Sequence, residues 1–403
     1  MRSLHSAIYF ALLASFVACL TGAPVARADD APAVPESAAV ADSSASMEAS
    51  TSTDVVPEVA VTAPPVQGNF MNPNISVIGW MQGSAGHDSH DATQSVLLKE
   101  AELGLQAVVD PYSRADVFIS FHDTDAASRE EAYLTFLTLP AGLQARLGKF
   151  RDGFGKFNLT HAGETPFTDR PLAPAAIFGE EGLSGSGAEL SWLVPNPFGL
   201  YANLTGTVQR SPTESPAFRP AANKNDLLYL GRLVTYADLS ESWNLNAGIS
   251  LVTAPSNPEL HATTAPAAPL RDHARVAGAD LTIRWKNRRQ ALYHSLMWQT
   301  EAYRLDAESD GGAVAPRRPH GGFSFVDYQV AQRWHLGVRG DWLQNVGNAA
   351  HTRGVLGFIT YTPTEFSLFS LQTRRVSYGP GDAAWEHFLK ITFNIGPHGA
   401  HPF

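Results

Sequence analysis

Charged residues recur inside segments that otherwise alternate apolar and polar side chains. The basic ones are Arg146, Lys149, Arg151, Arg232, Arg284, Arg339 and Lys390, and the acidic ones are Glu100, Glu102, Asp116, Glu189, Asp280 and Asp341. Successive side chains of a strand point to opposite faces, so Arg146 would face away from Ala145 and Leu147. Charges of both signs on the polar face of a sheet can line a water-filled passage and select solutes, or can simply pair with one another.

A long polar segment, Leu159 to Ser186, carries a second set of charged residues. They are Glu164, Asp169, Arg170, Glu180 and Glu181. Folded into a passage, this segment would constrict it, and opposed acidic and basic groups would set up a transverse field that orients solutes. The alternative is a loop that only covers the mouth.

Histidines invite a metal hypothesis. His87 and His90 alternate with Asp88 and Asp91 in one segment, and His398 and His401 close the chain. Imidazoles with carboxylates can ligate zinc or nickel. The strand count below puts the two segments at opposite ends of the strands, however, so we predict no metal site and no cofactor.

Motifs for catalysis are weak. The Gly/Ser-rich run from Gly182 to Gly187 lacks the strand-turn-helix context that a serine hydrolase nucleophile requires. His122 and His294 could serve as bases, but the sequence pairs neither with a nucleophile. We therefore predict no enzymatic activity and keep hydrolysis of a lipid or ester as an alternative.

Composition excludes several classes of protein. The chain has 403 residues, of which 44% are hydrophobic and 17% charged, and its formal net charge of −10 argues against nucleic acid as a partner. A single cysteine, Cys19, excludes a disulfide scaffold. Beyond the N-terminus no apolar run reaches the roughly 18 residues that a membrane helix needs.

The elements that must position the charged residues read as strands. From residue 69 onward, many alternating segments run about 10 residues, longer than the usual five or six of soluble proteins. Short and long connections take turns between them. The short ones fall at 110–113, 140–142, 195–199, 240–242, 287–289, 333–335 and 363–365, and the long ones at 83–94, 122–128, 159–186, 211–225, 253–272, 305–322, 345–353 and 376–384. Short turns at one end and long loops at the other are typical of an outer-membrane β-barrel.

The last predicted strand shows the two faces that such a barrel needs. Leu389, Ile391, Phe393 and Ile395 alternate with Lys390, Thr392 and Asn394. One face would meet lipid and the other water. A soluble β-sandwich has the same alternation, so the strand lengths and the alternating connections favour the barrel.

The N-terminal part of the chain differs from the rest. Arg2, the apolar run from Ile8 to Leu20 and the small residues Ala26 and Ala28 predict an export signal over residues 1–28. An alternative makes Cys19 a lipid-anchored N-terminus. Residues 29–68 are rich in Ala, Pro and Ser and without aromatic residues, which predicts a disordered periplasmic tether.

The segment from Leu147 to Gly155 carries a resemblance to a known family. Its Gly148, Phe150, Phe154 and Gly155 are similar to the Gly-x-Phe-x-x-x-Phe-Gly stretch of phosphate-selective porins of the Gram-negative outer membrane. The resemblance spans residues 69–403 and implies a porin barrel, small anions such as phosphate as solutes, and a homotrimer. The basic residues that a phosphate-selective pore needs are not obviously clustered in the sequence, which leaves the class of solute open.

We therefore expect an all-β fold in which residues 69–403 form a transmembrane antiparallel β-barrel of about 16 strands, within a range of about 14 to 18. The expected function is a porin-like channel in the outer membrane, surrounded by lipid, for passive diffusion of small hydrophilic solutes or ions. A hydrolase and a closed structural or adhesion barrel are the alternatives.

Overall fold

The computed structural model describes residues 73–90, 95–123, 127–195, 201–212, 214–257, 273–290, 292–307, 319–344 and 351–396. The predicted export signal (1–28), the predicted tether (29–68) and His398 and His401 lie outside these residues. Across the described ranges, no helix combines the length and the apolar character needed to cross a bilayer.

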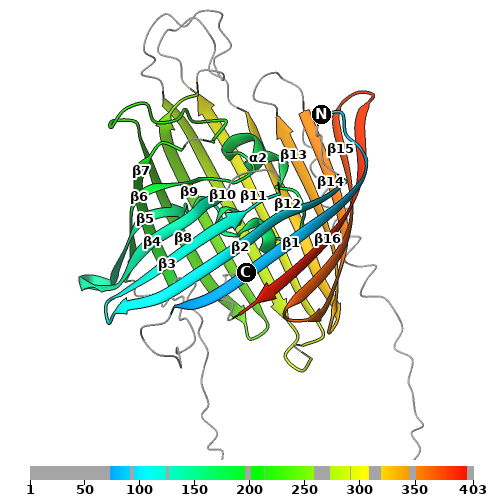
Figure 1. Cartoon of the computed structure of the whole chain (residues 1–403), viewed down its shortest axis with the longest axis horizontal. Coiled ribbons are helices and arrows are strands. Elements are labelled where there is room, and N and C mark those ends of the chain that lie inside the picture. Colours follow the sequence, from blue (N-terminus) through cyan, green and yellow to red (C-terminus); the bar gives the residue numbers. More distant parts are fainter. Residues whose placement is uncertain are drawn as a thin grey trace, which may run out of the picture. The chain divides into compact units, whose positions relative to one another are not determined.

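Sixteen antiparallel strands form a closed barrel, in which each strand pairs with the next one in the sequence and the last pairs with the first (Figure 1). The strands are β1 (Asn74–His87), β2 (Val96–Asp110), β3 (Ser113–Phe121), β4 (Ser128–Leu139), β5 (Leu143–Arg151), β6 (Ser184–Leu193), β7 (Tyr201–Arg210), β8 (Leu227–Ser240), β9 (Trp243–Pro255), β10 (His273–Lys286), β11 (Ser295–Ala307), β12 (His320–Ala331), β13 (Trp334–Gln344), β14 (His351–Thr364), β15 (Ser367–Gly379) and β16 (Asp382–Ile395). The predicted fold class and strand number are confirmed.

Pairing between the first and last strands closes the sheet. Their register runs from Val77 opposite Ile395 to His87 opposite Trp385. Closure leaves no edge strand, so every strand has a hydrogen-bonded neighbour on both sides. A sheet that crosses a bilayer needs this closure because hydrocarbon offers no partner to an unpaired backbone group.

One expected long loop is wrong. Residues 376–384 belong largely to β15 and β16, which pair as far as Gly379 opposite Asp382. Only Pro380 and Gly381 connect them, and Gly381 has a φ of 79°. Proline followed by a glycine at positive φ is the chemistry of a type II turn, which closes a hairpin without a loop.

The barrel wall has an apolar outside. Large exposed hydrophobic residues occupy alternate positions of the strands, such as Ile249 and Leu251 on β9, Val355 on β14 and Leu371 on β15. The side chains between them point inward and are buried, as Ser250 and Val252 show. The predicted alternation of faces therefore holds in these strands.

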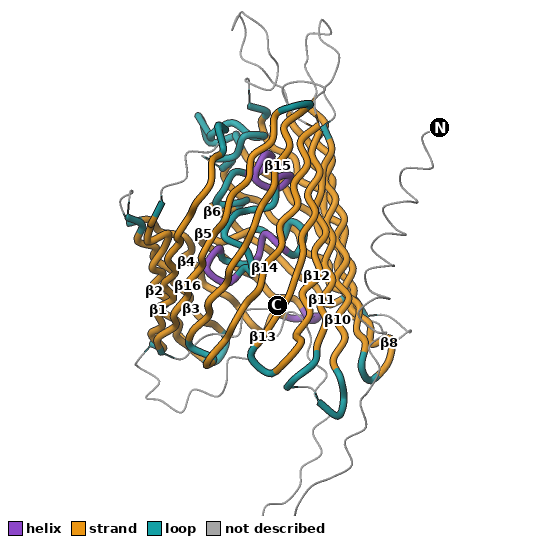
Figure 2. The backbone as a smooth tube through the Cα atoms, turned by 90° about the vertical axis from the view of Figure 1, so that its right-hand side faces the viewer, coloured by secondary structure: helices purple, strands orange, loops and turns teal. Residues whose placement is uncertain are grey.

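The interior of the barrel holds one long connection. Residues 152–183, between β5 and β6, contain the 3₁₀ turns η2 (Phe157–Leu159) and η3 (Ala162–Glu164) and the short helix α2 (Leu172–Phe178). Figures 1 and 2 show helical turns inside the ring of strands, and α2 contacts the inner side of β11, β12 and β13. We call residues 152–183 the lumen loop.

Candidate functional site: the lumen loop and the charged inner wall

A glycine and a wall carboxylate turn the chain inward at the end of β5. Gly155 has a φ of 65°, and a side chain there would collide with the carboxylate of Glu301 on β11. The backbone N–H groups of Lys156 and Phe157 donate to Glu301 Oε1 at 3.0 and 2.7 Å. Glu301 thereby satisfies two donors of a turn that lies inside the barrel.

Aromatic side chains pack one face of the lumen loop against the wall. Phe167 meets Phe325 of β12 edge-on, with 5.0 Å between ring centroids, and meets Phe358 of β14 at 5.6 Å. Phe154 packs against Phe178 of α2 at 5.0 Å. These side chains belong to one buried cluster, so the loop is held by a small apolar core inside the barrel.

A buried lysine of the wall also holds the loop. Lys390 of β16 is fully buried, and its ammonium donates to the carbonyl oxygens of Ala162, Thr165 and Phe167 at 3.1, 2.7 and 3.1 Å. The same ammonium lies 4.6 Å from the ring centroid of Trp80. Three carbonyl groups of residues 162–167 thus converge on one ammonium group.

Asp169 of the lumen loop is clamped by two arginines. Its Oδ2 accepts hydrogen bonds from Arg339 of β13 at 2.7 Å and from Arg374 of β15 at 3.0 Å. Burial by itself would raise the pKa of Asp169, but the two guanidinium groups outweigh burial and lower that pKa below its usual value. Arg339 also binds Asp341 at 2.8 Å, and Arg374 binds Glu386.

The Asp169→Asn variant is expected to lose about 3 kcal/mol of unfolding free energy, because removing one partner of a buried ion pair costs roughly 3–5 kcal/mol and both arginines keep a second carboxylate. The lowered pKa stabilises the fold above the unfolded value of 3.8 and stops doing so as the pH falls through the folded value. Below about pH 4 the difference between the two chains should therefore shrink. Urea titration, followed by heat-modifiable gel migration, measures the unfolding free energy of both chains at neutral and at low pH. Equal values at neutral pH would show that the two arginines do not stabilise the fold through Asp169.

A cluster of carboxylates surrounds His161 of the lumen loop. Its Nδ1 lies 2.6 Å from Glu102 Oε2 and 3.2 Å from Glu130 Oε2, and its Nε2 lies 2.8 Å from Glu131 Oε1. Burial and nearby Arg151 lower the pKa of His161, but the contacts with the three carboxylates outweigh them and raise it well above its usual value.

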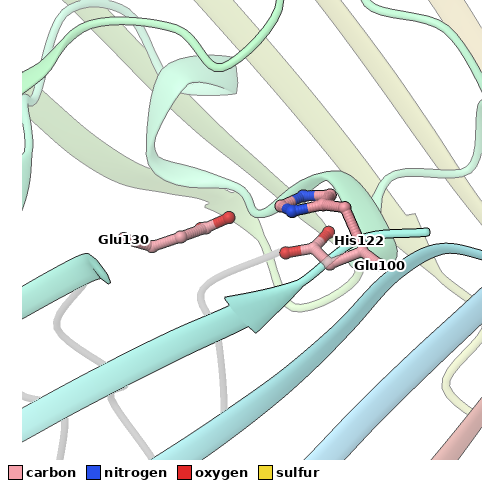
Figure 3. Close-up of side chains that lie close together, drawn as sticks. All are labelled: Glu100, His122 and Glu130. Atoms are coloured by element: carbon pink, nitrogen blue, oxygen red, sulfur yellow. The ribbon is translucent and has the colours of Figure 1, made fainter. Parts of the chain in front are cut away.

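A second group of possible ligands adjoins this cluster and shares Glu130. Glu100, His122 and Glu130 have side-chain ligand atoms within 4.8 Å of one another. Figure 3 shows the Glu130 side chain approaching Glu100 and His122 from the opposite side. Glu100 also accepts hydrogen bonds from Trp80 at 3.2 Å and from Ser120 at 2.9 Å.

Most of the remaining predicted wall charges are paired. Arg146 binds Glu189 at 3.0 Å, Arg151 binds Glu130 at 2.9 Å, Arg232 binds Asp280 at 2.6 Å, and Asp116 binds Arg114 at 2.6 Å. Arg284 is half-buried and lies four residues after Asp280 on β10, so both side chains face inward. Lys149 lies three positions after Arg146, on the opposite face, and donates to the backbone carbonyl of Arg129.

The other charges of the lumen loop differ in exposure. Burial raises the pKa of Glu164 to about 8, against the opposing effect of His161. Burial lowers the pKa of Arg170 to about 10, and its guanidinium donates to Asn158 at 2.7 Å. Glu180 and Glu181 are exposed, although the backbone carbonyl of Glu181 accepts a hydrogen bond from Arg151.

The predicted histidine candidates lie elsewhere. His87 is exposed at the end of β1, and His90 lies 2.9 Å from Asp382 at the start of β16. Neither belongs to the groups of possible metal ligands found among the described residues. The two groups that do occur use glutamates of β2 and β4. One adds His122, which follows β3, and the other adds His161 of the lumen loop.

Several important residues of this interior were missed by the sequence analysis. They are Glu130, Glu131, His161, Glu301, Arg374 and Glu386. Glu301 and Glu386 sit in alternating segments and could have been found by the same criterion as Glu100. Glu130 precedes another glutamate and Arg374 precedes another arginine, so alternation alone does not tell which of each pair faces inward.

The closed sixteen-stranded barrel shares its fold with solved outer-membrane porins and channels. No protein-family model matches the chain. An uncharacterized protein of Aquifex aeolicus is 28% identical over 356 residues, which are 80% of this chain and 73% of that protein.

Solved structures of outer-membrane proteins share the fold at low sequence identity. OmpT of Vibrio cholerae in a trimer form has a TM-score of 0.53 at 9% identity, covering 80% of this chain and 100% of its own. The anion-selective porin of Comamonas acidovorans has a TM-score of 0.52 at 8% identity, with coverages of 80% and 100%. The outer membrane channel DcaP of Acinetobacter baumannii has a TM-score of 0.52 at 10% identity, with coverages of 80% and 98%.

Proposed function

We propose that the protein is an outer-membrane channel through which small hydrophilic solutes and ions diffuse passively, without any covalent step. The observation that carries the proposal is a closed barrel with an apolar outside and a charged inner wall. Arg146 and Glu189 lie on that inner wall with 19% and 13% of their side chains exposed, and Arg284 is half-buried in an inward position. Water in contact with these groups would offer solutes a polar path.

The lumen loop sets the size limit in this proposal. Phe167 packs into the apolar cluster, Lys390 binds carbonyl groups of the loop, and two arginines bind Asp169. A loop held from several strands narrows the passage permanently rather than on demand. Liposome-swelling rates with neutral solutes of increasing size test this: we expect a steep decline already among small sugars, and equal rates for small and large sugars would contradict it.

Ion selectivity is expected to be weak. Most inner-wall charges are neutralised by a partner, as Arg232 is by Asp280 and Arg339 is by Asp169 and Asp341. Paired charges leave little net field to attract one sign of ion. The reversal potential in a salt gradient should therefore stay near zero, and a strongly anion-selective value that phosphate shifts further would instead favour a phosphate-selective pore.

We also propose a homotrimer, supported only by the trimer form of the Vibrio cholerae structure that shares the fold. Light scattering of the purified protein in detergent tests the assembly. A mass of three chains is expected, and a stable single chain would contradict it.

A closed structural barrel is the second candidate. The buried apolar cluster between the lumen loop and the wall favours a closed barrel, because the side chains of Phe154, Phe167 and Phe323 are 0% exposed. If the packing extends across the whole lumen, no solute passes. If the folded protein inserts into liposomes and no solute enters them, the barrel is closed.

The Ile249→Arg variant tests the membrane placement of the barrel. Ile249 lies at the middle of β9 on the outer face and is 61% exposed. An arginine facing lipid at the bilayer midplane costs roughly 2–4 kcal/mol, whereas the cost falls to about 0–1 kcal/mol near the interface. Leu239→Arg, at the end of β8, is the matched control. Refolding titrations into lipid vesicles measure both, and equal losses would contradict a spanning β9.

A further inference from the structure

His161 occupies an electrostatic position that a neutral imidazole does not satisfy. Carboxylates face both ring nitrogens, with Glu102 and Glu130 at Nδ1 and Glu131 at Nε2. A neutral imidazole carries a single N–H and would present a lone pair to one of these carboxylates. All four side chains are only 5–6% exposed, so water does not relieve that repulsion. The site therefore requires a positive charge at Nδ1, supplied by a proton or by a metal ion.

Carboxylates outnumber the basic side chains that contact them directly in this region. Four carboxylates gather here, from Glu100, Glu102, Glu130 and Glu131, and each residue is at most 8% exposed. Arg151 neutralises one of them through its 2.9 Å contact with Glu130. Lys390 attracts Glu100 from a distance, but its ammonium donates its hydrogen bonds to three backbone carbonyls and not to a carboxylate. Burying carboxylates without a cation partner costs free energy, and a bound divalent cation would neutralise two of these negative charges.

The geometry points to a divalent transition-metal site on the inner wall, and we propose that Glu102, Glu130 and His161 ligate a zinc-like ion there. Ligand bonds of about 2.0–2.1 Å in a tetrahedral site hold neighbouring ligand atoms about 3.3 Å apart. The 3.2 Å between His161 Nδ1 and Glu130 Oε2 matches this separation. The 2.6 Å between His161 Nδ1 and Glu102 Oε2 opens to it by a shift of under about 1 Å.

The surroundings of His161 have the form that metal-bound histidines favour. Its Nε2 faces Glu131 Oε1 at 2.8 Å, and Glu131 Oε2 accepts the backbone N–H of Arg151 at 2.9 Å. A carboxylate at the second ring nitrogen fixes the tautomer that leaves Nδ1 free to bind metal. Mixed imidazole and carboxylate ligands favour zinc, nickel and similar ions over magnesium and calcium, which prefer oxygen alone.

Glu100 and His122 form a second, separate group of possible ligands beside this site. Their ligand atoms lie close to Glu130 (Figure 3), and His122 is half-buried. Metal binding replaces the proton on His161 Nδ1, and that proton leaves to solvent. This inference concerns ion binding alone and does not depend on whether solutes cross the barrel.

Metal binding to the purified full-length barrel tests the proposal. The chelator-treated protein is dialysed against zinc or nickel, and bound metal is counted by mass spectrometry. We expect one ion per wild-type chain and its loss in both Glu102→Gln and His161→Gln. The matched control is His335→Gln, because His335 lies 3.1 Å from Asp327 on the same inner wall. That variant should bind like the wild type.

Two further measurements distinguish zinc bound by Glu102, Glu130 and His161 from zinc bound adventitiously. X-ray absorption of the zinc-loaded chain should show nitrogen and oxygen ligands with the signature of coordinated imidazole. Heat-modifiable migration identifies variants that fail to fold, and only folded variants are counted. A folded wild-type chain that binds no zinc would overturn the proposal, as would equal zinc binding by wild type and both cluster variants.

Discussion

Replacing residues 153–182 with a short turn is expected to raise the single-channel conductance several-fold. The register of β5 and β6 permits the replacement, because Arg151 already lies opposite Ser184 and a tight hairpin can join them in place of the lumen loop. The change removes Phe154, Phe157 and Phe167 from the interior, together with the η turns and α2. A wider water-filled cross-section carries more ions at the same voltage.

The replacement has a clear control and a clear contrary result. Inserting the same short turn in place of residues 365–366, which join β14 and β15 at the opposite end of the barrel from the lumen loop, should leave the conductance unchanged. Heat-modifiable migration and circular dichroism confirm that both barrels are folded. A folded barrel that lacks the loop and still conducts like the wild type would show that the loop does not narrow the path.

The Lys390→Met variant is expected to loosen the lumen loop while leaving the barrel closed. Methionine fills a similar space but leaves the carbonyls of Ala162, Thr165 and Phe167 without their donor. Each buried acceptor left unpaired costs about 1–3 kcal/mol, so we expect a loss on the order of 3 kcal/mol if the loop partly relaxes. The current should then become noisy, and the loop should become sensitive to added protease.

Lys149→Met is the matched control for this variant. Lys149 is only half-buried and donates to one carbonyl, that of Arg129. Its replacement should change stability by less than about 1 kcal/mol, because an exposed hydrogen bond is exchanged for one with water. Equal noise and equal protease sensitivity in the two variants would argue that Lys390 does not hold the loop.

The barrel could be predicted because its two strongest signals are local. Alternation at every second residue, as in Leu389, Lys390 and Ile391, reports the two faces of a strand directly. Loop lengths then gave the strand number. The error at 376–384 arose from polar composition near Gly379, Pro380 and Gly381, which reads as a loop although the same residues close a two-residue turn.

The interior could be predicted only in part because its contacts join distant residues. The sequence singled out Asp169 and Arg339 separately, but nothing local pairs residues 170 positions apart. Glu130 and Glu131 both reach the cluster because the register of β3 and β4 shifts opposite them, between Phe118 and Ile119. Such a bulge re-aims one side chain and is invisible to an alternation rule.

Single-channel recording of the purified, refolded chain in planar lipid bilayers shows whether ions cross the barrel. We expect discrete, uniform current steps that are small for a barrel of sixteen strands and grow when residues 153–182 are replaced. If a folded and inserted protein gives no steps either with or without the lumen loop, the barrel is not a channel.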